Sequence, residues 1–245
     1  MNYLYNNTYK NAYPFPYMII KDFFNQRDLM SCATSIKSGI NNLPWKTQEK
    51  ITNHQVKKRW IEDVALMPNP VKKIMWQLHS CEFLNFLREL TGINGIISDP
   101  SNLGGGMHCT SRGGKLNIHK DFNYSEETSL YRKINVLVFL NQPWLPEWGG
   151  NLEFWDKNLK SKVVEIPPLF NTMVIFNTDE DSLHGCPDPL NCPQDEHRLS
   201  LAAYYYIYSS PEQQKESRPF AEFHETNFSQ RKPKGKNSLS GKINL

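Results

Sequence analysis

The chain has 245 residues, of which 39% are hydrophobic and 12% aromatic. This apolar content is enough for a sizeable core and excludes overall disorder, and the length suits one domain. The formal net charge of +3 is too small to predict binding to nucleic acid. No run of about eighteen apolar residues occurs, so we expect no membrane-spanning helix.

The cysteines and the N-terminus bear on location. Five cysteines, odd in number and widely spaced, predict reduced thiols and not a disulfide framework. Cys186 and Cys192 are separated by five residues and lack a second pair of ligands, so a zinc site there is not expected. The N-terminus lacks the basic start and the apolar stretch of a signal peptide. We therefore expect a cytoplasmic protein.

The first part of the chain has helical patterns. Residues 17–24 (YMIIKDFF) indicate a short strand, and Asn25 is a suitable N-cap for a helix that ends near Ser38. Apolar side chains recur at near-helical spacing from Val71 to Leu90, which predicts a second helix. The helical N-terminal part is thus expected at about 25–90.

From about residue 100 onward the chain consists of short runs typical of strands. They are rich in Val, Ile, Phe and Tyr and are separated by turn residues: KLNIH, KINVLVFLN, NLEFWD, KVVEI, TMVIF and RLSLAAYYYIY. This pattern predicts a mainly β fold with flanking helices, a cupin-like double-stranded β-helix or jelly roll. We expect one domain over 1–210, with its jelly-roll core at about 100–210, and an irregular C-terminal wrap with a basic tail over 211–245.

The strongest chemical signal is His119-Lys120-Asp121 followed by His184. Alternate residues of a strand point to the same side, so His119 and Asp121 can reach one ion while Lys120 faces away. His184 follows the apolar run TMVIF and must come from a different strand. Two imidazoles and one carboxylate on one face of an octahedral metal leave positions open for a co-substrate and dioxygen. Because such a short motif also occurs by chance, it is a hypothesis that needs structural context.

Arg198 and Ser200 share one face of the strand that begins near Arg198. A buried guanidinium needs an anionic partner, because an unpaired buried charge is costly. The distal carboxylate of a dicarboxylate meets this need through paired hydrogen bonds. The other interpretation is that Arg198 lies at a rim and pairs with Asp195 or Glu196. The sequence leaves both interpretations open.

In combination these motifs resemble the Fe(II)/2-oxoglutarate-dependent dioxygenase superfamily, and most closely its prolyl 4-hydroxylase-like branch. The similarity covers roughly Pro14 to Ser210. It is strongest in the blocks GGKLNIHKDFN, LVFLN, GGNLEFWD, FNTDEDSLHGCPDP and RLSLAAYYY.

The resemblance implies roles for individual residues. His119, Asp121 and His184 would bind iron, and Arg198 would bind the distal carboxylate of 2-oxoglutarate with help from Ser200. No catalytic residue is assigned beyond the metal ligands.

Further pocket residues are assigned from the same resemblance. Prolyl hydroxylases often present a tyrosine hydroxyl to the distal carboxylate, whereas this chain offers Phe139, which cannot donate a hydrogen bond. Tyr131, near the start of the same strand, is a candidate replacement or else a packing residue. Asn135 is a candidate for contact with the keto acid or the substrate. His108 and Trp155 are candidate pocket residues, although His108 also suits a plain strand position and Trp155 suits the core better.

The activity implied by the resemblance is hydroxylation of an unactivated C–H bond with Fe(II), dioxygen and 2-oxoglutarate. Succinate and carbon dioxide would be co-products, and ascorbate is an expected reductant. The substrate would be a peptide or a small molecule: by analogy a prolyl residue of a peptide or protein, with a free amino acid or a sugar as alternatives.

Two other classes use a similar fold. A cupin-like zinc hydrolase would have similar ligands but no need for the strand arginine. A non-catalytic, metal-binding cupin-like module would tolerate the loss of a ligand, whereas this chain keeps all three.

Overall fold

The computed structural model describes residues 3–47, 53–99, 101–208, 218–225 and 242–244. Its helices are α1 (Tyr3–Lys10), α2 (Gln26–Gly39), α3 (Asn69–Leu78) and α4 (Cys81–Thr91), with 3-10 helices at Val64–Leu66 and Pro146–Trp148. Its strands are β1 (Tyr17–Lys21), β2 (Lys46–Thr47), β3 (Gln55–Ile61), β4 (Ile97–Ser98), β5 (Gly106–Lys120), β6 (Tyr124–Ser125), β7 (Leu130–Phe139), β8 (Leu152–Trp155), β9 (Lys162–Ile166), β10 (Thr172–Asn177), β11 (His184–Cys186), β12 (His197–Tyr208), β13 (Glu222–His224) and β14 (Lys242–Asn244).

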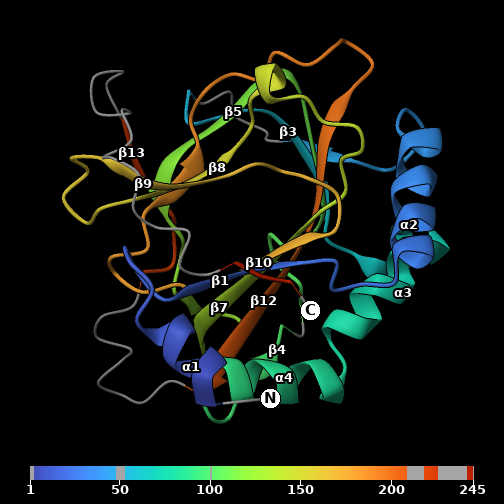
Figure 1. Ribbon diagram of the computed structural model, residues 1–245. Helices are drawn as coiled ribbons and strands as arrows, with labels where there is room; N and C mark the ends of the chain where they lie inside the picture. The colour runs from blue at the N-terminus through green and yellow to red at the C-terminus, as the bar shows by residue number, and fades with distance from the viewer. Residues whose placement is uncertain (1–2, 48–52, 100, 209–217, 226–241, 245) are drawn as a thin grey trace.

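The strands form one curled, mostly antiparallel sheet in the order β14-β1-β10-β7-β12-β5-β11-β8-β9. The first half of β5 pairs with β12 and its second half pairs with β11, so this long strand runs from one layer into the other. Side chains of β8 and β9 pack against those of β1, β7 and β10 inside the roll. The predicted jelly roll is therefore confirmed (Figure 1).

The helices cover the outer face of the larger layer (Figure 1). Alternate residues of the central strands, such as Val136 of β7 and Leu199 of β12, share a core with the helices. The intervening residues point into the roll, where Phe139, Phe154 and Phe176 pack together. Because both faces are buried, the register of each central strand decides which side chains reach the interior.

The first predicted helix is confirmed as α2, and Asn25 accepts a hydrogen bond from the backbone nitrogen of Arg27 at 3.0 Å. The helix predicted from Val71 to Leu90 is instead two helices, α3 and α4. The break lies at Ser80, whose hydroxyl accepts a hydrogen bond from the backbone nitrogen of Phe83 at 3.2 Å. Both helices bury apolar side chains in the same core, so the apolar spacing continues across the break and conceals it.

Several elements were not predicted from the sequence, and the longest of them are α1 and β3. Helix α1 forms in the Tyr/Asn-rich start, and β3 (QVKKRWI) carries no alternating pattern. Of the predicted irregular segment 211–245, residues 218–225 and 242–244 are described, and they include β13, which pairs with β5, and β14, which pairs with β1. The other residues of that segment, including most of the basic tail, lie outside the described residues.

The structure also bears on the cysteines and on membranes. All five cysteines are free thiols. Among the described residues, no helix has the length and apolar character needed to span a membrane.

Replacing Ser80 with alanine should lower the free energy of unfolding by about 1 kcal/mol, because α4 loses its N-cap. Ser31→Ala is the matched control: Ser31 is exposed in the middle of α2 and its hydroxyl bonds only the Arg27 carbonyl. Urea unfolding should show a clear loss for Ser80→Ala and almost none for Ser31→Ala. Equal losses would contradict a capping role for Ser80.

Candidate active site

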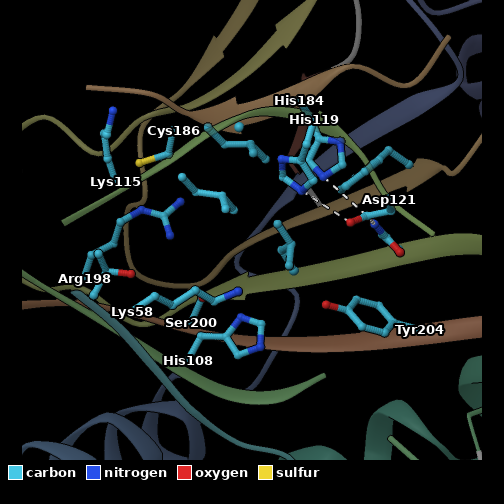
Figure 2. A pocket seen from close by; sticks show the side chains of 17 residues that line it. Lys58, His108, Lys115, His119, Asp121, His184, Cys186, Arg198, Ser200 and Tyr204 are labelled. Atoms are coloured by element: carbon cyan, nitrogen blue, oxygen red, sulfur yellow. Dashed lines mark hydrogen bonds and ion pairs between the residues drawn. The ribbon is translucent and has the colours of Figure 1, made fainter. Parts of the chain in front are cut away.

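Two paired strands bring the predicted metal ligands together. His119 lies near the end of β5, Asp121 follows β5 directly, and His184 begins β11. His184 lies opposite His119 in the pairing of the two strands, and their ring centroids are 4.4 Å apart. One ligand atom from each of the three residues lies within 4.8 Å of the other two (Figure 2).

Backbone carbonyls orient both imidazoles. His119 Nδ1 lies 2.9 Å from the carbonyl oxygen of Asn117, and His184 Nδ1 lies 2.9 Å from that of Ser182. A carbonyl only accepts, so each Nδ1 carries the proton and each Nε2 presents a lone pair to the centre.

The Nε2 atoms of both histidines lie close to the Asp121 carboxylate. The two Nε2 atoms, of His119 and His184, lie 3.3 and 3.4 Å from its oxygens. Burial lowers the pKa of His119, and the neighbouring His184 lowers it further, which favours a neutral His119 ring. Acceptor atoms that converge in this way need a cation between them. Two imidazoles and one carboxylate are the ligand set of mononuclear Fe(II) oxygenases, so the residues fit this metal.

Two buried donors hold Asp121 in place. Its Oδ2 accepts hydrogen bonds from Arg132 Nη2 at 3.0 Å and from Asn135 Nδ2 at 2.6 Å. Burial would raise the pKa of Asp121, but the charge of Arg132 holds it well below its usual value. The carboxylate therefore remains an anionic ligand. Asn135, predicted to contact the keto acid or the substrate, lines the pocket and is already bonded to a ligand.

Arg132 was not predicted from the sequence. Strict alternation along β7 would place Arg132 and Asn135 on opposite faces. The pairing of β7 with β12 skips Lys133, and this β-bulge brings Arg132 onto the interior side with Asn135. The guanidinium is 1% exposed and lies 3.4 Å from the ring centre of Tyr204. The only hint in the sequence is a pair of basic residues within an otherwise apolar strand.

The pocket continues from the metal ligands toward the start of β12 (Figure 2). Its lining includes all three ligands and most of the other predicted site residues: His108, Asn135, Arg198 and Ser200. It also includes residues that were not predicted: Lys58, Thr110, Lys115 and Cys186. Cys192 packs elsewhere, with Trp144 and Leu190, so it does not share a site with Cys186.

Arg198 is placed to receive an anion. Its Nε donates to the carbonyl oxygen of Gly150 at 2.7 Å, and its guanidinium lies 4.9 Å from the ring centre of Phe139. Within the part of the chain that the structure describes, no carboxylate lies within 4.0 Å of the Arg198 guanidinium. Glu196, the alternative partner considered above, instead pairs with Lys37 at 3.2 Å. The rim interpretation is therefore not supported.

Phe139 and Tyr131 do not line the pocket. Phe139 is fully buried and packs against the Arg198 guanidinium. Tyr131 pairs with Ile207, nine residues along β12 from Arg198, which is about 30 Å at strand spacing. Its hydroxyl accepts a hydrogen bond from Asn123 at 2.8 Å. Tyr131 is therefore too distant to bind the carboxylate that Arg198 would hold, and its proposed role is corrected.

Trp155 is a core residue, as the second interpretation held. It packs with Ile118 and Leu183 and donates from Nε1 to Glu153 at 2.9 Å, outside the pocket. His108 does line the pocket, and its Nε2 lies 3.0 Å from the carbonyl oxygen of Gly104. Burial, together with the charge of Lys58, lowers the pKa of His108 well below its usual value.

A C-terminal segment supports the turn that carries Asp121. Arg218 donates from Nε and Nη2 to the carbonyl oxygen of Asp121 at 2.9 and 2.8 Å. In β13, Phe223 lies opposite His119 and stacks on its ring at a centroid distance of 5.2 Å. Neither residue was predicted, because nearly a hundred residues separate them from the motif and no local pattern marks them.

Arg218→Ala should weaken metal binding by about tenfold, because the Asp121 turn loses both side-chain donors. Arg112→Ala is the control: its guanidinium also bonds backbone carbonyls, at Asn191 and Cys192, but away from the metal ligands. Titration of the metal-free protein with Fe(II) under nitrogen gives the affinities. Unchanged affinity in Arg218→Ala would contradict the supporting role.

Comparisons with known proteins agree with this geometry. Residues 105–206 match the model of a family described as the 2OG-Fe(II) oxygenase superfamily. The chain is 26% identical over 188 residues to the prolyl 3,4-dihydroxylase OGFOD1 of Ostreococcus tauri. That alignment covers 70% of this chain but only 34% of the longer relative.

Two solved structures share the fold. A Trichoplax adhaerens prolyl hydroxylase, in complex with a peptide fragment of the hypoxia inducible factor oxygen degradation domain, matches with a TM-score of 0.60 and 19% identity, over 83% of this chain and 89% of that one. A Pseudomonas putida prolyl-4-hydroxylase matches with a TM-score of 0.52 and 15% identity, over 79% of this chain and 93% of that one. The names of all three relatives refer to prolyl hydroxylation or dihydroxylation. The predicted resemblance to the 2OG-Fe(II) oxygenase superfamily is thus confirmed over residues 105–206, which include all three candidate metal ligands and Arg198.

Proposed function

We propose that this protein is a dioxygenase that hydroxylates an unactivated C–H bond of a prolyl residue in a peptide or protein. The observation that carries the proposal is one pocket with two ends. At one end, His119, Asp121 and His184 converge on a single point. At the other end, Arg198 has no carboxylate partner among the described residues and faces the same space.

Each end performs a separate task. The three ligands would hold Fe(II), and Arg132 and Asn135 keep Asp121 anionic and oriented toward it. Arg198 would pair with the distal carboxylate of 2-oxoglutarate and so orient its keto acid toward the metal. When bound, Fe(II) and 2-oxoglutarate supply the oxidising power, with succinate and carbon dioxide as the co-products.

The walls of the pocket would protect this chemistry. Leu137, Leu152 and Phe176 line it between the two ends. These apolar side chains would limit access of water and of other reductants to the reacting atoms.

The choice of a peptidyl substrate is supported by the relatives. The curated relative is named a prolyl 3,4-dihydroxylase, and the Trichoplax adhaerens structure is of a prolyl hydroxylase in complex with a peptide fragment. The peptidyl substrate is inferred from these likenesses.

Addition of Fe(II) and then 2-oxoglutarate to the metal-free protein without oxygen should produce the visible charge-transfer band of a chelated keto acid. His184→Ala should abolish the band, and Arg198→Ala should require at least about tenfold more 2-oxoglutarate, because a charge-assisted pair is lost. His79→Ala, at the end of α3 and away from the pocket, should behave as wild type. A wild-type protein that binds Fe(II) but gives no band would overturn the oxygenase proposal.

With oxygen present, a peptide library containing proline should gain one oxygen atom on a prolyl residue, with one succinate formed for each hydroxylation. Mass spectrometry of the peptides and quantification of succinate measure both. Free proline and simple sugars serve as competing substrates. Turnover of these alone would refute the peptidyl substrate while leaving the dioxygenase assignment intact.

A further inference from the structure

Lys58 is a second cation in the same pocket, and its backbone lies in register with that of Arg198. In the sheet, Thr110 of β5 pairs with Lys58 of β3 on one side and with Arg198 of β12 on the other. All three residues line the pocket. Neighbouring strands are about 4.8 Å apart, so the Lys58 and Arg198 backbones are about 10 Å apart across Thr110. Figure 2 shows Arg198 on the side of the pocket away from His119, His184 and Asp121, with the Lys58 side chain extending from that side toward the middle of the pocket.

A local irregularity of β3 directs Lys58 inward. The register between β3 and β5 shifts between Val56 and Lys58, and Lys57 has a positive φ of 49°. Lys57 is exposed, and its Nζ donates to the carbonyl oxygen of Arg112 at 3.1 Å. A positive φ at a residue other than glycine costs about 1–2 kcal/mol, so the fold accepts strain to place Lys58 in the pocket.

The described residues give the Lys58 ammonium no carboxylate within ion-pair distance. Asp121, the acid of this pocket, is already bonded to Arg132 and Asn135 and is a metal ligand. Burial lowers the pKa of Lys58 to about 8, with Asp121 opposing this effect and Arg198 adding to it. A cation held in this way is stabilised by an anion that enters the pocket.

We infer that Lys58 is a second anchor, beside Arg198, for the distal carboxylate of the dicarboxylate co-substrate. The inference rests on the proposed function. Phe139, which packs against the Arg198 guanidinium, has no hydrogen-bond donor to offer such a carboxylate. Lys58 supplies a second donor from a different strand.

The test compares two keto acids in the anaerobic Fe(II) titration. 2-Oxoglutarate has the distal carboxylate, and 2-oxovalerate has the same keto acid and chain length but ends in a methyl group. Lys58→Met should weaken 2-oxoglutarate binding about tenfold, because it loses one charge-assisted hydrogen bond. Binding of 2-oxovalerate and of Fe(II) should be unchanged. Lys58→Arg, which restores a cation, should recover part of the affinity for 2-oxoglutarate.

Lys57→Met is the matched control, because it removes the same charge from the adjacent residue, on the outer side of β3. It should leave both affinities unchanged. Circular dichroism and Fe(II) binding exclude misfolding of the Lys58 variants. Equal weakening of both keto acids in Lys58→Met, or no weakening, would overturn the role of Lys58 but not the proposed function. Failure of the wild type to bind 2-oxoglutarate at all would overturn both.

Discussion

The antiparallel pairing of β5 with β11 is the constraint on which the whole site depends. It places His184 opposite His119, although sixty-five residues separate them in the sequence. The same strand β5 pairs with β3, β12 and β13. One strand therefore sets the relative positions of both imidazoles, of Arg198 and of Lys58. A shift of its register by one residue would move these side chains to the other face of the sheet.

Electrostatics then divides the pocket into two ends. At the metal end, the buried Arg132 guanidinium offsets the cost of burying the Asp121 carboxylate, and the histidines keep their lone pairs directed inward. At the other end, Arg198 and Lys58 line the pocket, and no carboxylate among the described residues lies within ion-pair distance of either. A cation in such a pocket is stabilised by an anion that pairs with it, so this end favours an anionic ligand. A short dicarboxylate with a chelating keto acid matches both ends.

The sequence predicted those parts of the site that follow regular strand alternation. His119 and Asp121 flank Lys120, and Arg198 and Ser200 flank Leu199; in each pair the structure confirms that both side chains line one pocket. The jelly roll was predictable because each strand is marked in its own sequence by a short apolar run with turn residues on either side. The break between α3 and α4 was concealed because both helices bury the same face.

The missed residues have a common physical cause. Arg132 and Lys58 each lie next to a register shift: β7 has one extra residue, Lys133, beside Arg132, and residues 111–114 of β5 lie opposite Lys57 alone beside Lys58. Arg218 and Phe223 reach the metal ligands only through the return of the C-terminal segment, which no local pattern encodes. Bulges are costly irregularities that persist where they direct a side chain toward a task. Arg132 reaches the Asp121 carboxylate beside one of these irregularities, and Lys58 lines the pocket beside the other, and this placement of two cations is an argument for function.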